Sequence, residues 1–248
     1  MTQDEIKEIE FFDRAARSIY PFPDAGYHAF IINIILNFYN INLSGRMLEC
    51  GCGTGEIGKY LSKRYPSLNV EGVDISKEII NKNCETPQKG YSCRRGNLEN
   101  KRLFVKESFD SILCVGFLHH FQYLDLLFDN FSFWIKPDGL IFIKEPNGDN
   151  PINKLSNFLR NIIGKNRCFK YGWSSFNESN HPLSFYLEAV KKSGFSNPFI
   201  IKSIQDSSRF NLWFDFRQLL FNLMIFFAPN AFNTRNNFFM VIRKQRHE

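Results

Sequence analysis

Short apolar runs alternate with longer helical patterns through much of this chain of 248 residues. Runs of four to eight apolar or β-branched residues are typical of buried strands, whereas apolar residues at spacings of three and four are typical of helices. Their alternation predicts an α/β fold in which crossover helices connect the strands of a parallel sheet. The predicted strands are 46–50, 69–74, 91–95, 109–116 and 139–145, and the predicted helices are 56–63, 76–83 and 122–135.

The length predicts a single domain with four parts. Residues 1–43 form a helical cap, in which Asp24 could begin a helix with apolar residues at helical spacing. Residues 44–145 form the core. Residues 146–183 are rich in Asn, Gly and Ser and longer than an ordinary connection, which favours a lid insertion. Residues 184–248 contain a predicted helix at 184–193 and predicted strands at 199–204 and 238–243.

A glycine-rich turn, Glu-Cys-Gly-Cys-Gly-Thr-Gly at 49–55, directly follows the first predicted strand. Three glycines at alternate positions allow positive φ angles and a close approach of the backbone to a ligand, because glycine has no Cβ. The helix that follows presents unpaired N–H groups and a partial positive charge. We therefore expect a nucleotide-like cofactor here, with Asp74 at the end of the next strand accepting hydrogen bonds from ribose hydroxyls.

The turn also fits a nicotinamide dinucleotide. Residues 53–58 read Gly-Thr-Gly-Glu-Ile-Gly, which also matches the dinucleotide fingerprint of NAD(P)-binding oxidoreductases. However, the chain contains no Tyr-x-x-x-Lys, and hydride transfer gives no role to Glu49, to the adjacent His119 and His120, or to the turn at 136–139. The oxidoreductase is therefore the less favoured alternative.

An ordered series of motifs extends over about residues 45–145. Its members are Leu48 to Gly55, Gly72 to Ser76, Gly96 to Leu98, Phe109 to Ile112, Leu118 to Phe121 and Ile135 to Gly139. As a set they resemble the class I S-adenosylmethionine-dependent methyltransferases, in the small-molecule group similar to the ubiquinone and menaquinone methylases (methyltransferase type 11). The resemblance implies a Rossmann-like, doubly wound, mostly parallel seven-stranded sheet whose last strand is antiparallel. It implies S-adenosyl-L-methionine as cofactor and S-adenosyl-L-homocysteine as product.

The resemblance also implies roles for individual residues. The turn glycines approach the methionyl part of the cofactor. Glu49 orders the turn and the ammonium group that the cofactor carries there, and Asp74 holds the ribose. Asn97 and Leu98 border the adenine, although the family more often has Asp at 97 and Gly at 138. The implied cofactor-binding residues are Glu49, Gly51, Cys52, Gly53, Gly55, Asp74, Ile75, Asn97, Leu98, Gly116 and Phe117.

Three histidines are candidates for catalysis. Methyl transfer from a sulfonium is an in-line displacement by a lone pair, so positioning is the main task, and a base matters only for a hydroxyl or a protonated nitrogen. His119 and His120 follow the fourth predicted strand, at the sheet edge where ligands collect, although one could instead cap a helix and the other pack under the cofactor. His181, beside Pro182 near the end of the lid segment, is the third candidate. No metal site is predicted.

Charge and composition limit the expected partners. The net charge of +6 is spread along the chain, so no nucleic acid is expected. The acidic start does not suit a signal peptide and no Cys-x-x-Cys occurs, which favours reduced thiols and a cytoplasmic protein. The aromatic segment 210–232 is interrupted by polar residues and predicts no transmembrane span. It could cover the sheet, line a site for a lipophilic acceptor, or rest on a membrane or a second subunit, so peripheral membrane contact stays open and no oligomeric state is predicted.

These observations predict methyl transfer to a small and, in one reading, lipophilic metabolite or natural-product intermediate, most simply at oxygen. N- or C-methylation and a catalytically silent cofactor-binding subunit are the alternatives. The stretch Phe11-Phe12-Asp13 with Tyr20 resembles the aromatic and acidic segment that closes over the cofactor in related enzymes.

Overall fold

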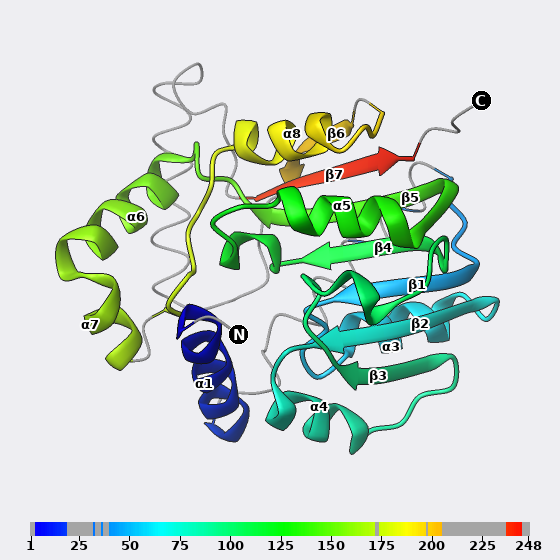
Figure 1. The fold of residues 1–248 in the computed structure, drawn as a ribbon, viewed down its shortest axis with the longest axis horizontal. Helices are drawn as coiled ribbons and strands as arrows, with labels where there is room; N and C mark the ends of the chain where they lie inside the picture. Colours follow the sequence, from blue (N-terminus) through cyan, green and yellow to red (C-terminus); the bar gives the residue numbers. More distant parts are fainter. Residues whose placement is uncertain are drawn as a thin grey trace.

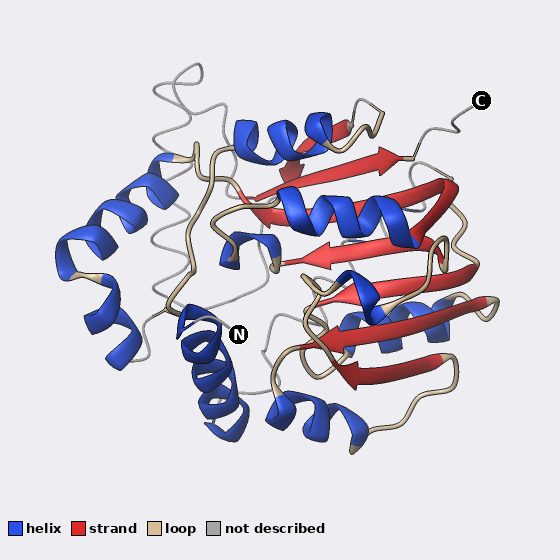
Figure 2. Cartoon of the chain, viewed as in Figure 1, coloured by secondary structure: helices blue, strands red, loops and turns tan. Residues whose placement is uncertain are grey.

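Seven strands form one sheet in the described part of the chain, in the order β3-β2-β1-β4-β5-β7-β6 (Figures 1 and 2). The computed structural model describes residues 3–18, 32, 36, 40–171, 174–196, 198–204 and 237–244. β7 is antiparallel to both neighbours, β5 and β6, and the remaining strand pairs are parallel, which confirms the predicted topology. The strands are β1 (Gly45–Cys50), β2 (Leu68–Asp74), β3 (Tyr91–Arg95), β4 (Phe109–Val115), β5 (Ile135–Pro146), β6 (Phe199–Ile204) and β7 (Asn237–Arg243).

Both faces of the central strands are buried, because successive side chains of a strand point to opposite faces. One core contains Leu48, Ile112 and Ile143. The other contains their neighbours Met47, Leu113 and Phe142, among others. This double burial explains why the strands read as continuous apolar runs.

Helices cover the two faces of the sheet and its carboxyl edge (Figure 2). α5 and α8 contribute to the first core, and α3 contributes Leu61 to the second, where the helical residues Ile32 and Leu36 also lie. The helices are α1 (Gln3–Ser18), α3 (Glu56–Arg64), α4 (Lys77–Cys84), α5 (Asp125–Trp134), α6 (Pro151–Ile163), α7 (Lys165–Lys170) and α8 (Leu183–Lys192), with 3-10 turns η1 (Lys101–Leu103) and η2 (Leu118–His120).

Two local predictions are refined by the structure. α5 begins at Asp125, three residues later than predicted. β5 begins at Ile135 and includes the predicted turn, in which Asp138 has a φ of 63°. That left-handed conformation suits glycine best and aspartate better than most residues, which accounts for Asp at a position where the family has Gly.

The carboxyl ends of β1 to β4 face α1, α6 and α7 (Figure 1). α6 and α7 lie within the predicted lid segment 146–183 and were not predicted as helices. No described helix is long and apolar enough to cross a membrane. Tyr20, most of the predicted helix after Asp24, and the aromatic segment 210–232 lie outside the described residues.

Candidate active site

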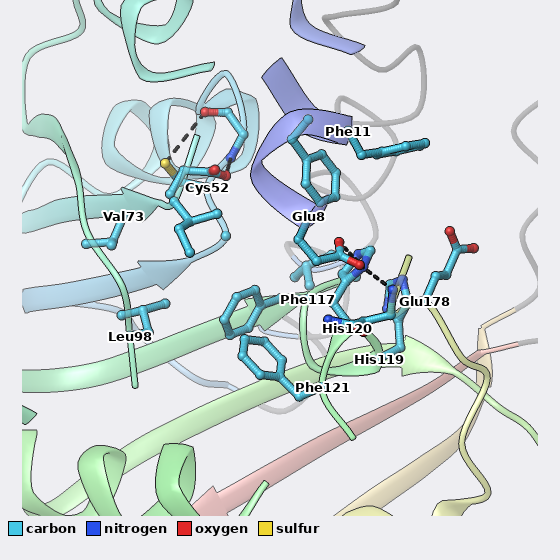
Figure 3. A pocket seen from close by; sticks show the side chains of 18 of the residues that line it. Glu8, Phe11, Cys52, Val73, Leu98, Phe117, His119, His120, Phe121 and Glu178 are labelled. Atoms are coloured by element: carbon cyan, nitrogen blue, oxygen red, sulfur yellow. Dashed lines mark hydrogen bonds and ion pairs between the residues drawn. The ribbon is translucent and has the colours of Figure 1, made fainter. Parts of the chain in front are cut away.

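A cavity of about 850 Å³ lies at the carboxyl edge of the sheet (Figure 3). Its volume is in the range of small-molecule and cofactor sites, roughly 300–1,000 Å³. The glycine turn and the ends of β2 and β4 line one side, and α1 and the loop 174–178 line the other. Of the predicted cofactor residues, the lining includes Gly51, Cys52, Gly53, Asp74, Ile75, Asn97, Leu98, Gly116 and Phe117, but neither Glu49 nor Gly55.

The glycine turn brings backbone to the cavity surface. Gly51 and Gly53 have φ angles of 62° and 54°, which other residues rarely adopt. A Cβ at Gly51 would lie 2.5 Å from the ring of Phe117, another lining residue. Gly55 lies behind the turn as the N-cap of α3, where a Cβ would collide with the hydroxyl of Tyr91. Gly51 and Gly53 therefore present backbone to the cavity, whereas Gly55 allows the turn to pack closely against Tyr91.

Asp74 connects the end of β2 to this turn. Its Oδ2 accepts a hydrogen bond from Gly53 N at 3.1 Å, and its Oδ1 accepts one from Ser76 N at 2.9 Å. Burial raises the pKa of Asp74 to about 6, although these backbone hydrogen bonds oppose the shift. Asp74 is therefore mostly ionised at neutral pH and lies at the cavity edge as a hydrogen-bond acceptor.

Glu49 supports the turn from behind. It is 4% exposed, and its Oε1 accepts a hydrogen bond from Gly58 N of α3 at 3.1 Å. Burial raises the pKa of this carboxyl to about 8, against the effect of the Gly58 hydrogen bond. The side chain thus joins the end of β1 to the helix that follows the turn.

A Glu49→Gln variant should lose much of the pH dependence of stability. Folding raises the pKa of Glu49 from 4.5 to about 8, so the stability linked to this proton is fully present below pH 4.5 and is lost as the pH rises through 8. Glutamine keeps an acceptor for Gly58 N and does not titrate. From pH 5 to pH 8.5 the wild type should lose on the order of 3 kcal/mol more in free energy of unfolding than the variant, measured by urea denaturation. Glu71→Gln, a substitution on β2 outside the cavity, is the control. If the free energy of unfolding depends on pH in the same way in the wild type and in Glu49→Gln, the buried-charge argument is contradicted.

Asn97 is held between its own loop and α1. Its Nδ2 donates to Oε1 of Glu5 at 2.9 Å, and its Oδ1 accepts from Glu99 N at 2.9 Å. Leu98 is buried beside it, and Ile75 lines the same cavity. The predicted adenine-bordering residues therefore share one end of the cavity, with α1 packed against it.

His119 lies in η2 and pairs with a carboxylate that the sequence reading missed. Its Nδ1 is 2.7 Å from Oε2 of Glu145, whose Oε1 accepts hydrogen bonds from Phe117 N at 2.8 Å and Leu118 N at 2.7 Å. Burial lowers the pKa of His119, but the hydrogen bond and charge of Glu145 outweigh this, and the pKa is raised overall. No described residue hydrogen-bonds Nε2. The signal available in the sequence was a glutamate that ends the apolar predicted strand 139–145, at the edge of the sheet where ligands collect.

His120 has a different environment. Its Nδ1 is 2.9 Å from Oγ of Ser175. The same nitrogen is 3.6 Å from Oε2 of Glu8 (Figure 3). Burial holds the pKa of His120 well below its usual range, and the charges of His119 and Arg160 act in the same direction. This imidazole is therefore neutral and serves as a hydrogen-bonding group.

His181 does not lie at the cavity. Its Nε2 is 3.0 Å from the carbonyl oxygen of Phe121, and its ring stacks on Phe185 with centroids 3.9 Å apart. Burial lowers the pKa of this histidine. The structure thus brings together two of the three candidate histidines and leaves His181 in a packing position.

α1 closes the cavity opposite the sheet and contributes a buried carboxylate. Oε1 of Glu8 accepts a hydrogen bond from Asn177 N, whereas Oε2 has no hydrogen-bond partner among the described residues. Burial raises the pKa of Glu8. Figure 3 shows this side chain extending from α1 toward the two histidines, with Phe11 on the same helix.

The loop that contacts Glu8 is organised by Arg160 of α6. The guanidinium donates to Oγ of Ser174 at 3.0 Å and to the carbonyl oxygens of Ser175, at 2.9 Å, and Phe176, at 2.7 Å. It also donates to the carbonyl oxygen of Glu178. The planar guanidinium suits this arrangement, because its donors spread in a fixed fork.

The cavity is acidic although the chain is basic overall. Lys144 is the only lysine or arginine in the lining of this described cavity. The acidic residues of the lining are Asp4, Glu5, Glu8, Glu56, Asp74, Glu99 and Glu178. Such a lining favours a ligand that carries positive charge.

A family model for methyltransferase domains matches residues 26–195, more than half of the chain. The chain belongs to this family, the class I S-adenosylmethionine-dependent methyltransferases. Its cofactor is S-adenosyl-L-methionine. The matched residues of this methyltransferase include the glycine turn, Asp74 and the η2 histidines, which line one cavity.

Known relatives of this methyltransferase transfer methyl groups to different atoms. It is 28% identical over 109 residues to (S)-coclaurine N-methyltransferase of Papaver somniferum, covering 40% of this chain and 28% of the relative. It is 27% identical over 119 residues to malonyl-[acyl-carrier protein] O-methyltransferase of Bacillus cereus, covering 45% and 41%. The matches thus span less than half of the length of these curated relatives.

A solved structure has the same fold. Phosphoethanolamine N-methyltransferase 2 of Haemonchus contortus, in complex with S-adenosyl-L-methionine, matches with a TM-score of 0.61 and 18% identity. The match covers 95% of this chain and 60% of that one.

Proposed function

We propose that this protein transfers the methyl group of S-adenosyl-L-methionine to a small, lipophilic acceptor, and that the acceptor atom is a hydroxyl oxygen. The observation that carries the proposal is the His119–Glu145 pair, which lies in the same cavity as the glycine turn. A hydroxyl must lose its proton during transfer, and a carboxylate-oriented imidazole is a suitable base.

The residues of the cavity fit the cofactor. Gly51 and Gly53 adopt positive φ angles and present backbone to the cavity, which suits the methionyl part. The carboxylate of Asp74 suits the ribose hydroxyls, and Ile75 and Leu98 provide apolar surface for the adenine. Glu49 holds the turn through Gly58 N. The acidic lining complements the positive charge of the sulfonium and the ammonium, and the bound cofactor supplies an electrophilic methyl group.

His119 is proposed as the base. Glu145 accepts from Nδ1–H, so neutral His119 carries its lone pair on Nε2, where it can accept the proton of the acceptor hydroxyl. The carboxylate then stabilises the imidazolium that results. α1, with Phe11 and Phe12, and the lid segment 146–183, through its loop 174–178, exclude water from this end of the cavity. His120, which lines the cavity, orients the acceptor, and Ser175 holds its ring through Nδ1.

N-methylation of an amine is the second candidate, and Glu8 favours it. Oε2 of Glu8 lies 3.6 Å from Nδ1 of His120 without a hydrogen bond, in a cavity with a strongly acidic lining, and is suited to bind an ammonium group. His119 would then take a proton from the ammonium and expose the nitrogen lone pair. The two candidates share the cofactor site and differ in what Glu8 contributes.

Glu8→Gln should separate the two candidates. We expect transfer of labelled methyl from S-adenosyl-L-methionine to lipophilic hydroxyl compounds to change less than about threefold, because Glu8 does not act on a neutral acceptor. For amine acceptors KM should rise roughly tenfold or more, because a charge-assisted hydrogen bond contributes about 1.5 to 3 kcal/mol. Glu10→Gln, an exposed position on the same helix, is the control. Binding of S-adenosyl-L-homocysteine without label transfer to these compounds or to any cell-extract fraction would replace both candidates by a cofactor-binding subunit.

A further inference from the structure

α6 has its polar side turned toward the protein. Nδ2 of Asn153 donates to the carbonyl oxygen of Asn147 at 2.8 Å. Asn157 donates to the carbonyl oxygen of Asn180 at 2.8 Å and accepts from Asn180 N at 3.2 Å. Arg160, one turn further, makes the loop contacts described above. Among the described residues, hydrogen bonds from these polar side chains, most of them to backbone, connect α6 to the body of the protein.

The opposite side of α6 is apolar and exposed. Leu155, Phe158, Leu159 and Ile162 are 55%, 60%, 47% and 67% exposed, at the spacing of one helix face. Tyr171, just after α7, is 61% exposed. Amphipathic helices usually bury this face, so this helix is inverted relative to an ordinary surface helix. Five of the nine large exposed hydrophobic residues in the described chain belong to this α6–α7 face.

Basic residues accompany this face. Between Pro151 and Asn177 the chain has Lys154, Arg160, Lys165, Arg167 and Lys170, and neither Asp nor Glu. Arg160 points inward, whereas Lys154, Arg167 and Lys170 are exposed. A helix with Phe and Leu on one face and lysines or arginines beside it is typical of segments that lie in the interface of an anionic bilayer.

We propose that the α6–α7 face docks on an anionic membrane surface. The exposed apolar side chains enter the boundary between headgroups and acyl chains, and the basic residues contact the lipid phosphates. The loop 174–178, which follows α7, lines the cavity, and α6 and α7 lie beyond the carboxyl ends of the strands (Figure 1). Docking therefore holds the acceptor side of the cavity close to the lipid. The proposal rests on the surface alone and stands whichever atom is methylated.

Vesicle flotation of the full chain tests the docking. The wild type should float with vesicles of phosphatidylcholine mixed with phosphatidylglycerol, and more weakly with phosphatidylcholine alone. Phe158→Glu with Ile162→Glu should lower the partition at least roughly tenfold, because both side chains lose their burial in the bilayer. Lys154→Gln with Lys170→Gln should lower it about 25-fold on the anionic vesicles only, taking about fivefold for each lysine. Leu126→Glu, at a 51% exposed residue of α5, is the control and should float like the wild type.

Four results would overturn the proposal. In the first, the wild type does not float with either vesicle. In the second, light scattering shows an oligomer that the Phe158→Glu, Ile162→Glu variant dissociates, so that a second copy covers the face. In the third, this double variant melts well below both the wild type and Leu126→Glu, so that the protein itself covers the face in solution. In the fourth, the Phe158→Glu, Ile162→Glu variant floats as well as the Leu126→Glu control, so that the α6–α7 face does not bind the vesicles.

Discussion

Asp74→Asn should weaken binding of S-adenosyl-L-homocysteine by roughly 100-fold, which corresponds to about 3 kcal/mol. The carboxylate is proposed to accept from the ribose hydroxyls while it also accepts from Gly53 N and Ser76 N. Asparagine has only one acceptor oxygen for these donors, and its amide N–H groups would face a donor. Titration calorimetry with S-adenosyl-L-homocysteine measures the effect directly and does not require a known methyl acceptor.

Asp110→Asn is the matched control. Asp110 lies at the amino end of β4, where it accepts from Arg46 N at 2.8 Å and pairs with Nζ of Lys136, far from the lining of the cavity. The Asp110→Asn substitution removes a carboxylate that, like Asp74, accepts a hydrogen bond from backbone. It should leave the affinity for S-adenosyl-L-homocysteine unchanged. An Asp74→Asn affinity within threefold of the wild type would exclude the proposed ribose contact.

The sheet could be predicted because its signals are local. Each central strand is a short apolar run, and the glycine turn must follow a strand and precede a helix for its backbone to reach a ligand. The same reasoning placed Asp74 at the edge of the sheet, the family resemblance added Asn97 and Gly116, and all three line the cavity. Asp138 shows that even a departure from the family pattern follows a local rule, since its φ of 63° tolerates aspartate.

The acceptor side could not be predicted, because tertiary contacts create it. Glu8 is about 110 residues from His120 in the chain and meets it only because α1 packs over the carboxyl edge. α6 was missed because its Asn-rich polar side faces inward, so that its composition suggests a loop. Proximity to the lid made His181 a candidate, but sequence position does not fix the direction of a side chain, and its ring stacks on Phe185.

Glu145→Gln should reduce turnover about 10²- to 10⁴-fold, the usual contribution of a general base, with little change in affinity for S-adenosyl-L-homocysteine. Oε1 of Glu145 accepts from two backbone N–H groups, so the glutamine carbonyl must take this position and its amide must face Nδ1 of His119. The amide then donates to Nδ1, which forces the proton of neutral His119 onto Nε2. The ring remains in place and can no longer accept a proton from the acceptor.

The pH profile separates this loss of a base from a loss of structure. In the wild type, kcat should rise with pH as His119 loses its proton, with a midpoint above the usual histidine value because Glu145 raises the pKa. His119→Ala should remove this limb and lower kcat to a similar level, and the two changes together should cost little more than either alone, because they disable one unit. If Glu145→Gln keeps the rising limb and most of its turnover, His119 only packs against the acceptor, and proton removal must be assigned to solvent or to another group.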